Sequence, residues 1–452
     1  MTDDELVEAL RQTFRDQAGS LRPSAGAVPS PPSRPRRVPR PGRRFALASL
    51  ATALAAGTAA AIVALNDHPN QAHNVSIAGE ASTVPVGPTV HRVAPSSIPP
   101  SSPPPTPSTA VTPPASPVPS GFQPLSVTFV SARTGWVLGT APCGRSRCTT
   151  LVRTTDAGYT WTEVSQPPMT LTTQGTGRTS IRFYDLNVGW IVAPAGPEGS
   201  ALWTSRDGGK DWTEEPNPGG ASATIEALET SNGLVHLVDL TPGKGVDQIF
   251  TSPVSQDSWA PAQAAPSFGA GPVPNSQIVL FGSSGWIVNV NRTVVGGARL
   301  DPATGWTTWT PPCADAHGPG SLAASSASDL YAICDEGVWG SPAAGTAPNS
   351  QWLYMSTDGG IRFAAVGPVR GGAPGGAIAV AAGTETIEQA GNSGIVATFD
   401  GGKSWAKVSG AAGITYLGFT TATQGVAISQ GTSSSGLLMT RDGGHTWVST
   451  TF

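Results

Sequence analysis

The sequence predicts an all-β protein, a seven-bladed β-propeller of four-stranded blades, preceded by one transmembrane helix and a disordered Pro-rich linker. Gly and Pro supply 55 and 43 of the 452 residues, and charged residues only 12 %. So many Gly and Pro residues would interrupt helices too often for a helical protein. All 13 tryptophans lie in residues 121–452, whereas 21 of the 43 prolines lie in residues 1–120, so only the C-terminal region can bury a large core. A short signal recurs in this region at near-regular spacing.

Residues 1–44 form the expected cytoplasmic segment. Thr2–Glu5 has capping-box spacing, and apolar residues follow on one helical face to about residue 17, which predicts a short amphipathic helix. This helix could dock on a cytoplasmic partner or on the inner leaflet, and a solvated stub is an equal alternative. Six arginines lie between Arg34 and Arg44.

Residues 45–65 are 21 residues without a charge, long enough for a helix to cross the roughly 30 Å hydrocarbon core of a bilayer. Because the basic run precedes them, the positive-inside rule puts the N-terminus in the cytoplasm and everything after residue 65 outside the cell membrane. A cleaved signal peptide and a buried helix are the alternatives. Residues 66–120 are the expected Pro/Ser/Thr-rich extracytoplasmic linker, which holds the 121–452 domain away from the membrane.

The repeated signal reads Ser/Thr-x-Asp-x-Gly-x-x-Trp. It is complete at Thr154–Trp161, Thr398–Trp405 and Thr440–Trp447, and Ser356–Phe363 ends in Phe; Thr204–Trp212 is expected to hold one extra residue before its tryptophan. Degenerate copies occur at Thr251–Trp259 and Leu300–Trp309. The aromatic ends are 42–54 residues apart, near the length of a four-stranded blade, which gives seven units.

Each signal is expected to form a turn, in which the Asp accepts backbone N–H bonds, the Gly takes a positive φ and the aromatic residue packs on the blade. The residues assigned this structural role are Asp156, Gly158, Trp161, Asp207, Gly209, Trp212, Asp358, Gly360, Phe363, Asp400, Gly402, Trp405, Asp442, Gly444 and Trp447.

This pattern resembles the Asp-box, or bacterial neuraminidase (BNR), repeat of sialidase-like, sortilin-type and photosystem-assembly-type propellers. The resemblance covers Gly121 to Phe452 and implies that each box lies between the third and fourth strands of a blade. A Gly-Trp pair or its echo about 25 residues earlier marks the second strand, as in Thr134–Thr140, Val188–Pro194 and Ser284–Val290. The register is least defined in blades 3 and 6, where the alternation is muted.

The four cysteines follow the expected membrane span, in an oxidising compartment, so we expect disulfides. Three connectivities are possible. We predict Cys143–Cys148 and Cys313–Cys334, because the strand assignment puts both pairs in loops of one propeller face. Metal binding is the alternative, but Cys-x4-Cys has no nearby His or third thiolate, and the six histidines are scattered. We therefore expect no metal site and no cofactor.

Sialidase-like activity would require a tyrosine nucleophile, a glutamate, an acid/base aspartate and an arginine triad. The Phe/Tyr-Arg-Ile-Pro motif of sialidases is absent from the domain start, where only Arg133 follows the first strand. Tyr159 lies in an Asp box and the other four tyrosines, at positions 184, 331, 354 and 416, lie in strand-like runs that favour packing roles. We expect no enzyme, with an exo-sialidase-like glycoside hydrolase as the minority alternative.

The expected function is therefore a membrane-tethered, non-catalytic binding or assembly scaffold for a protein or a cell-envelope ligand. A transmembrane sensor that couples external binding to the cytoplasmic helix is another alternative. Residues 121–452 hold 16 Lys and Arg against 23 Asp and Glu, which argues against a nucleic-acid partner. The candidate ligand-binding side chains lie in loops opposite the Asp boxes, although exposed arginines often serve only solubility: Arg145, Arg147, His317, Trp339 and Arg370.

Overall fold

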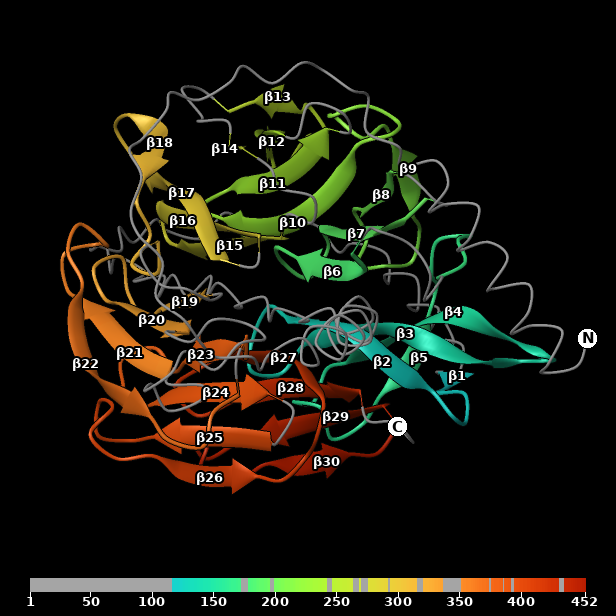
Figure 1. The fold of residues 1–452 in the computed structure, drawn as a ribbon. Coiled ribbons are helices and arrows are strands. Elements are labelled where there is room, and N and C mark those ends of the chain that lie inside the picture. The colour runs from blue at the N-terminus through green and yellow to red at the C-terminus, as the bar shows by residue number, and fades with distance from the viewer. Residues whose placement is uncertain are drawn as a thin grey trace, which may run out of the picture. The chain divides into compact units, whose positions relative to one another are not determined.

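The computed structural model describes residues 116–171, 178–195, 199–241, 246–262, 268–269, 275–291, 293–314, 320–335, 351–373, 375–384, 386–391, 394–430 and 435–452. These residues form seven antiparallel sheets around one axis, so the prediction of a seven-bladed all-β propeller is confirmed (Figure 1). The expected cytoplasmic segment, the 45–65 span and residues 66–115 of the linker lie outside the described residues. Among the residues that are described, no helix has the length and apolarity needed to cross a membrane.

In each blade the four main strands follow one another outward from the axis in chain order. Blades 1 and 2 contain β2 (Gln123–Phe129), β3 (Gly135–Cys143), β4 (Ser146–Thr154), β5 (Thr162–Val164), β6 (Ser180–Phe183), β7 (Gly189–Pro194), β8 (Ser200–Ser205) and β9 (Thr213–Glu215). Blades 3 and 4 contain β10 (Thr224–Ser231), β11 (Leu234–Thr241), β12 (Val246–Pro253), β13 (Ala260–Pro261), β15 (Asn275–Phe281), β16 (Ser284–Asn291), β17 (Thr293–Asp301) and β18 (Gly305–Trp309).

Blades 5 to 7 contain β19 (Gly320–Ala324), β20 (Leu330–Asp335), β21 (Gln351–Ser356), β22 (Ala364–Val369), β23 (Ile378–Val380), β24 (Ile387–Gly391), β25 (Gly394–Thr398), β26 (Ala406–Ser409), β27 (Ile414–Phe419), β28 (Gly425–Gln430), β29 (Ser435–Thr440) and β30 (Val448–Thr450). Two short strands lie at blade edges: β1 (Ser116–Pro117) pairs with β5, and β14 (Phe268–Gly269) pairs with β12. The inner strand of blade 6, β23, has only three residues, which explains the weak alternation of the sequence there.

The hydrophobic core is divided among the junctions between blades. Each of its clusters combines residues of neighbouring sheets; the cluster between blades 4 and 5, for example, holds Trp286 of β16 and Leu330 of β20. The glycine that opens the second strand permits this packing, because a Cβ on Gly135 would lie 2.7 Å from the Phe129 ring and one on Gly189 would lie 2.5 Å from Phe183. Gly-Trp is therefore a packing signal: the glycine admits a ring from the first strand, and the tryptophan fills the junction.

Within the part of the chain that the structure describes, the ring closes without exchange of strands between its first and last blades. Blade 7 consists only of β27–β30, and β2 of blade 1 packs against β28 and β29. The closing junction is apolar and includes Phe129, Tyr416 and Met439. The ring of Phe452 also contacts Phe122, with centroids 4.7 Å apart. Side-chain packing, and not a shared sheet, thus joins the two ends of the propeller.

One detail of the sequence analysis is wrong. Blade 2 has no extra residue in its Asp-box turn, because Ser205 and not Thr204 is the first residue of that turn. The Ser205 hydroxyl bonds to Asp207 at 3.0 Å and accepts the N–H of Gly209 at 2.9 Å, the pattern found in the complete copies.

Candidate recognition face

The alternation of strand directions gives the ring two distinct faces. The hairpins between second and third strands, together with the connections from each blade to the next, lie on one face, which we call the recognition face. The Asp-box turns and the turns between first and second strands lie on the other, which we call the Asp-box face. Both predicted disulfides are present and belong to the recognition face.

A disulfide and the hydrogen bonds of one arginine stabilise the hairpin between β3 and β4. The Cys143–Cys148 disulfide joins the two strands, with Cα atoms 5.7 Å apart. Arg147 donates to the Thr140 hydroxyl at 2.8 Å and, through Nη2, to the carbonyls of Thr140 and Gly121 at 2.6 and 2.9 Å. Arg147 is therefore committed to its own hairpin, whereas Arg145 at the tip is exposed.

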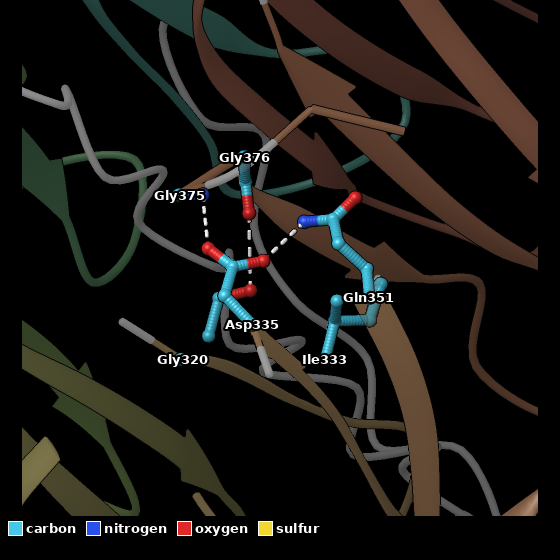
Figure 2. A pocket seen from close by; sticks show the side chains of 7 residues that line it. Gly320, Ile333, Asp335, Gln351, Gly375 and Gly376 are labelled. Carbon is cyan, nitrogen blue, oxygen red and sulfur yellow. Dashed lines mark hydrogen bonds between the residues drawn. The ribbon is translucent and has the colours of Figure 1, made fainter. Parts of the chain in front are cut away.

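A small polar hollow lies on the same face where the chain passes from blade 5 to blade 6 (Figure 2). The Asp335 carboxylate points from the end of β20 toward this connection and accepts the Gly375 N–H at 2.7 Å and the Gln351 side-chain N–H at 2.6 Å. The hydroxyl of Ser321 donates to the Gly376 carbonyl at 3.1 Å. These polar side chains thus clasp one glycine-rich crossover.

The Cys313–Cys334 disulfide supports this hollow from one side, because Cys334 directly precedes Asp335 and a Cβ on Gly320, which lines the hollow, would collide with Cys313. Burial raises the pKa of Asp335 to about 6, although its two hydrogen bonds oppose the rise. The hollow encloses about 130 Å³ including its open mouth, too little for a sugar ring, and both oxygens of Asp335 already have donors. Sequence reasoning missed this clasp; the only signal was the Gly-rich segment from Gly371 to Gly376.

Three buried side chains from the inner strands of blades 2, 3 and 7 lie together. Arg182 of β6 and Glu229 of β10 form an ion pair with Nε and Oε1 2.6 Å apart, and both are almost fully buried. The guanidinium of Arg182 also lies 6.0 Å from the ring centroid of Tyr416, which is 3 % exposed and follows a register shift in β27. Burial raises the pKa of Glu229 to about 7, against the attraction of Arg182.

The tyrosines have the packing roles expected from the sequence, with one exception. Tyr331 and Tyr416 are buried, and Tyr184 and Tyr354 pack against core clusters. Tyr159 is 71 % exposed on the Asp-box face. Tyr416 is the tyrosine that lies beside both an arginine and a glutamate, a grouping that the sequence did not suggest because the three residues are far apart in the chain.

The five Asp-box turns share one hydrogen-bond network. The hydroxyl of the first residue donates to the Asp at 2.7–3.0 Å and accepts the N–H of the glycine at the fifth position at 2.8–2.9 Å. The Asp also accepts an N–H from four residues later at 2.9–3.0 Å. The second glycine of the turn has a positive φ, for example 94° at Gly402. In each turn Oδ1 of the Asp accepts both the hydroxyl and the later N–H, and in three turns Oδ2 accepts a further hydroxyl.

These networks lower the pKa of the Asp-box carboxyls, that of Asp400 to about 2 through the hydroxyl and N–H of Ser404. The carboxylates are partly or fully exposed at the surface of their turns. Because their pKa values are lowered, these groups are ionised at neutral pH and have no proton to donate as general acids.

Of the five candidate ligand-binding side chains, Arg145, Arg147 and Arg370 are described by the structure. Arg145 belongs to blade 1 and the exposed Arg370 to the end of blade 5, so two blades separate them on the recognition face. His317 and Trp339 lie outside the described residues. Within the described ranges, no group of three or more His, Cys, Asp or Glu side chains could hold a metal ion.

Comparison with known proteins extends only to the fold. No protein family model matches the sequence, and no curated protein sequence matches it either. YCF48 bound to D1 peptide is 16 % identical with a TM-score of 0.47, and the match covers 73 % of this chain and 94 % of that one. A PL25 ulvan lyase is 12 % identical (TM-score 0.46; 74 % and 96 % covered), and the β-propeller domain of the Trilobed protease from Pyrococcus furiosus, described as an open velcro topology, is 9 % identical (0.44; 74 % and 99 %). The chain is a seven-bladed propeller.

Proposed function

We propose that this chain is a membrane-tethered, extracytoplasmic propeller of the Asp-box type that binds a protein or a cell-envelope ligand on its recognition face without catalysis. The observation that carries the proposal is the burial of the Arg182, Glu229 and Tyr416 cluster on the inner strands β6, β10 and β27. Each of these residues is at least 96 % buried, Arg182 pairs with Glu229, and its guanidinium lies 6.0 Å from the ring centroid of Tyr416. A nucleophile must reach its substrate to act on it.

The recognition face offers what a binding role needs. Among the described residues of this face, two disulfides and the Asp335 clasp brace the β3–β4 hairpin and the blade 5 to 6 crossover, and a fixed surface loses less conformational entropy when a partner binds. Arg145 and Arg370 project from this rigid frame as exposed cations, able to pair with carboxylate or phosphate groups of a partner. Both cations lie on a domain that is otherwise net negative, so they mark local positive sites.

Capture of partners from cell-envelope extracts tests the proposal. The full chain, an Arg145→Ala/Arg370→Ala double variant and a Lys210→Ala/Lys403→Ala double variant are compared; the two lysines are exposed on the Asp-box face and serve as the matched control. We expect the arginine variant alone to lose the specific partner. If all three proteins captured the partner equally well, the recognition face would not be its binding site.

The tethering is tested separately. Protease added to intact spheroplasts should digest the propeller and spare a tag at the N-terminus, because residues 66–452 are expected outside the membrane. Protection of the C-terminal domain would contradict the topology. A ligand-dependent change in crosslinking of residues 1–44 in vesicles would favour the sensor alternative.

The glycoside hydrolase alternative has one specific observation in its favour. Tyr416, Glu229 and Arg182 are the residue types that a sialidase-like mechanism uses, and they lie together. For catalysis this cluster would have to open and expose the Tyr416 hydroxyl. Turnover that depends on this hydroxyl is the outcome that would favour the enzyme.

A further inference from the structure

One position in the second strand of each blade packs toward the following blade, and in blades 1, 4 and 6 it lies against the Asp-box turn of that blade. It is the residue paired with the one just before the turn, and its side chain packs into the junction between the two blades. The residues at this position in blades 1 to 7 are Trp136, Trp190, His236, Trp286, Tyr331, Glu388 and Val426.

Where this residue is a tryptophan and the next turn is complete, its indole bridges the junction. Trp136 donates from Nε1 to the carbonyl of Gly208 at 3.1 Å, and Trp286 donates to that of Gly359 at 3.0 Å. Both acceptors are the fourth residue of the following turn. The glycine at the fifth position leaves room for the indole: a Cβ on Gly360 would lie 3.1 Å from the Nε1 of Trp286.

Glu388 occupies this position in blade 6 and, like Trp286, lies against the fifth-position glycine of the following turn. Its side chain is fully buried, and a Cβ on Gly444, the fifth residue of the blade 7 turn, would collide with its Oε1. Oε1 accepts the indole N–H of Trp447 at 3.2 Å, whereas Oε2 is buried with no hydrogen-bond partner. An ionised carboxylate with one unsatisfied buried oxygen is costly.

No positive charge compensates Glu388 in the described structure. Its strand partners are Ala379 and Ala397. From the blade 7 turn it faces Asp442, whose charge adds to the effect of burial, and the two together raise the pKa of Glu388 well above its ordinary value. The basic side chains of that turn are directed elsewhere: His445 stacks on Phe399 with centroids 3.8 Å apart, and Arg441 donates to the carbonyl of Ala157 in blade 1.

We propose that Glu388 is a neutral carboxylic acid in the folded ring and donates its proton from Oε2 to the carbonyl of Gly443. Gly443 is the fourth residue of the blade 7 turn, equivalent to Gly208 and Gly359. A carboxylic O–H thus takes the place of the indole N–H that two other junctions use. The hydrogen bond from Glu388 to Gly443 then links blades 6 and 7. Loss of that proton leaves a buried anion beside Asp442 and an unpaired carbonyl.

Blade 6 contributes few large apolar side chains to this junction, whereas blade 7 contributes Ile414, Leu417, Phe419 and Leu438. On the blade 6 side its buried residues are mostly alanines: Ala377, Ala379, Ala381, Ala390 and the larger Ile395. Alanine side chains bury far less apolar surface than the tryptophans of other junctions. We therefore expect alkaline pH to weaken the blade 6 to 7 junction through Glu388.

The test compares the pH dependence of unfolding of the full chain with that of Glu388→Gln, whose amide keeps a donor but does not titrate. Because the folded form holds a proton that the unfolded chain releases above the ordinary Glu pKa, raising the pH must weaken wild-type folding. We expect the folding equilibrium constant of the wild type, relative to the variant, to fall roughly tenfold per pH unit above about pH 5. Glu163→Gln, on the outer strand of blade 1, is the matched control and should follow the wild type.

Glu388→Met removes both oxygens and provides a second reference that does not titrate. The protonated-carboxyl C=O band in the infrared spectrum at pH 7 should be stronger in the wild type than in Glu388→Gln and Glu388→Met, because Glu229 and Asp335, whose pKa values are also raised, contribute equally to all three spectra. A pH-independent stability ratio between the wild type and either variant, or no change in the band, would mean that Glu388 is ionised and would overturn the proposal.

Discussion

The guanidinium of Arg441, in the last Asp-box turn, lies 4.2 Å from the ring centroid of Tyr159, in the first. Its Nη2 also donates to the Ala157 carbonyl at 2.8 Å. One side chain therefore connects blades 7 and 1 at the junction that no shared strand holds. A comparable residue, Arg206 of the blade 2 turn, reaches Asp257 of blade 3 at 2.6 Å.

Replacement of Arg441 by Ala should therefore weaken ring closure. Loss of a cation–π contact and one hydrogen bond predicts a fall of about 1–2 kcal/mol in the free energy of unfolding, measured with urea. Arg362→Ala is the matched control, because Arg362 is exposed on another Asp-box turn, and it should stay within about 0.5 kcal/mol of the wild type. Equal effects of both substitutions would show that Arg441 does not help to close the ring.

The bridge from Trp136 to Gly208 predicts a difference between two similar substitutions. Trp136→Phe leaves the buried Gly208 carbonyl without its donor, whereas the Nε1 of Trp190 is buried without a partner. Both changes remove the same volume, so Trp136→Phe should cost about 1–3 kcal/mol more than Trp190→Phe in chemical denaturation. A larger loss for Trp190→Phe would contradict the bridging role.

The buried ion pair predicts strong coupling between Arg182 and Glu229. Glu229→Gln leaves a buried guanidinium without its counter-ion and should destabilise the protein by about 3–5 kcal/mol. The double variant Arg182→Met/Glu229→Leu removes both charges and should recover much of that loss. Additive effects of the two single substitutions in a double-mutant cycle would mean that the two charges do not depend on each other.

Asp400 contributes to the predicted acid sensitivity of the protein. Its folded-state pKa of about 2 lies below the ordinary value of 3.8, so its stabilising effect is present above about pH 4 and is lost as the pH falls toward 2. Asp400→Asn should lower the melting temperature at pH 6, and the difference from the wild type should shrink between pH 4 and pH 2. A difference that stays constant down to pH 2 would show that the carboxylate charge has no role in the turn.

Sequence reasoning found the blades because their signals are local. The Thr154, Asp156 and Gly158 network closes within five residues, and Gly135-Trp136 begins a strand whatever lies across the junction. The two disulfides followed because strand order decides which face a loop occupies. Such features need no knowledge of distant contacts.

The Arg182, Glu229 and Tyr416 cluster and the junctions could not be predicted in the same way. Arg182 and Glu229 are 47 residues apart and contact Tyr416 of blade 7 only after the ring has closed. Glu388 lies in the blade 6 segment whose alternation was muted, because its inner strand is short and the usual tryptophan is replaced by an acid. Arg147 was a candidate ligand contact, and only the structure shows its bonds to Thr140 and Gly121.

We propose that the burial of Arg182, Glu229 and Tyr416 leaves this propeller a binding module without catalysis. The most direct measurement is turnover of fluorogenic sialosides and a glycosidase panel by the full chain and by Tyr416→Phe. The account predicts no turnover by either protein. Turnover by the wild type that disappears in Tyr416→Phe would contradict it.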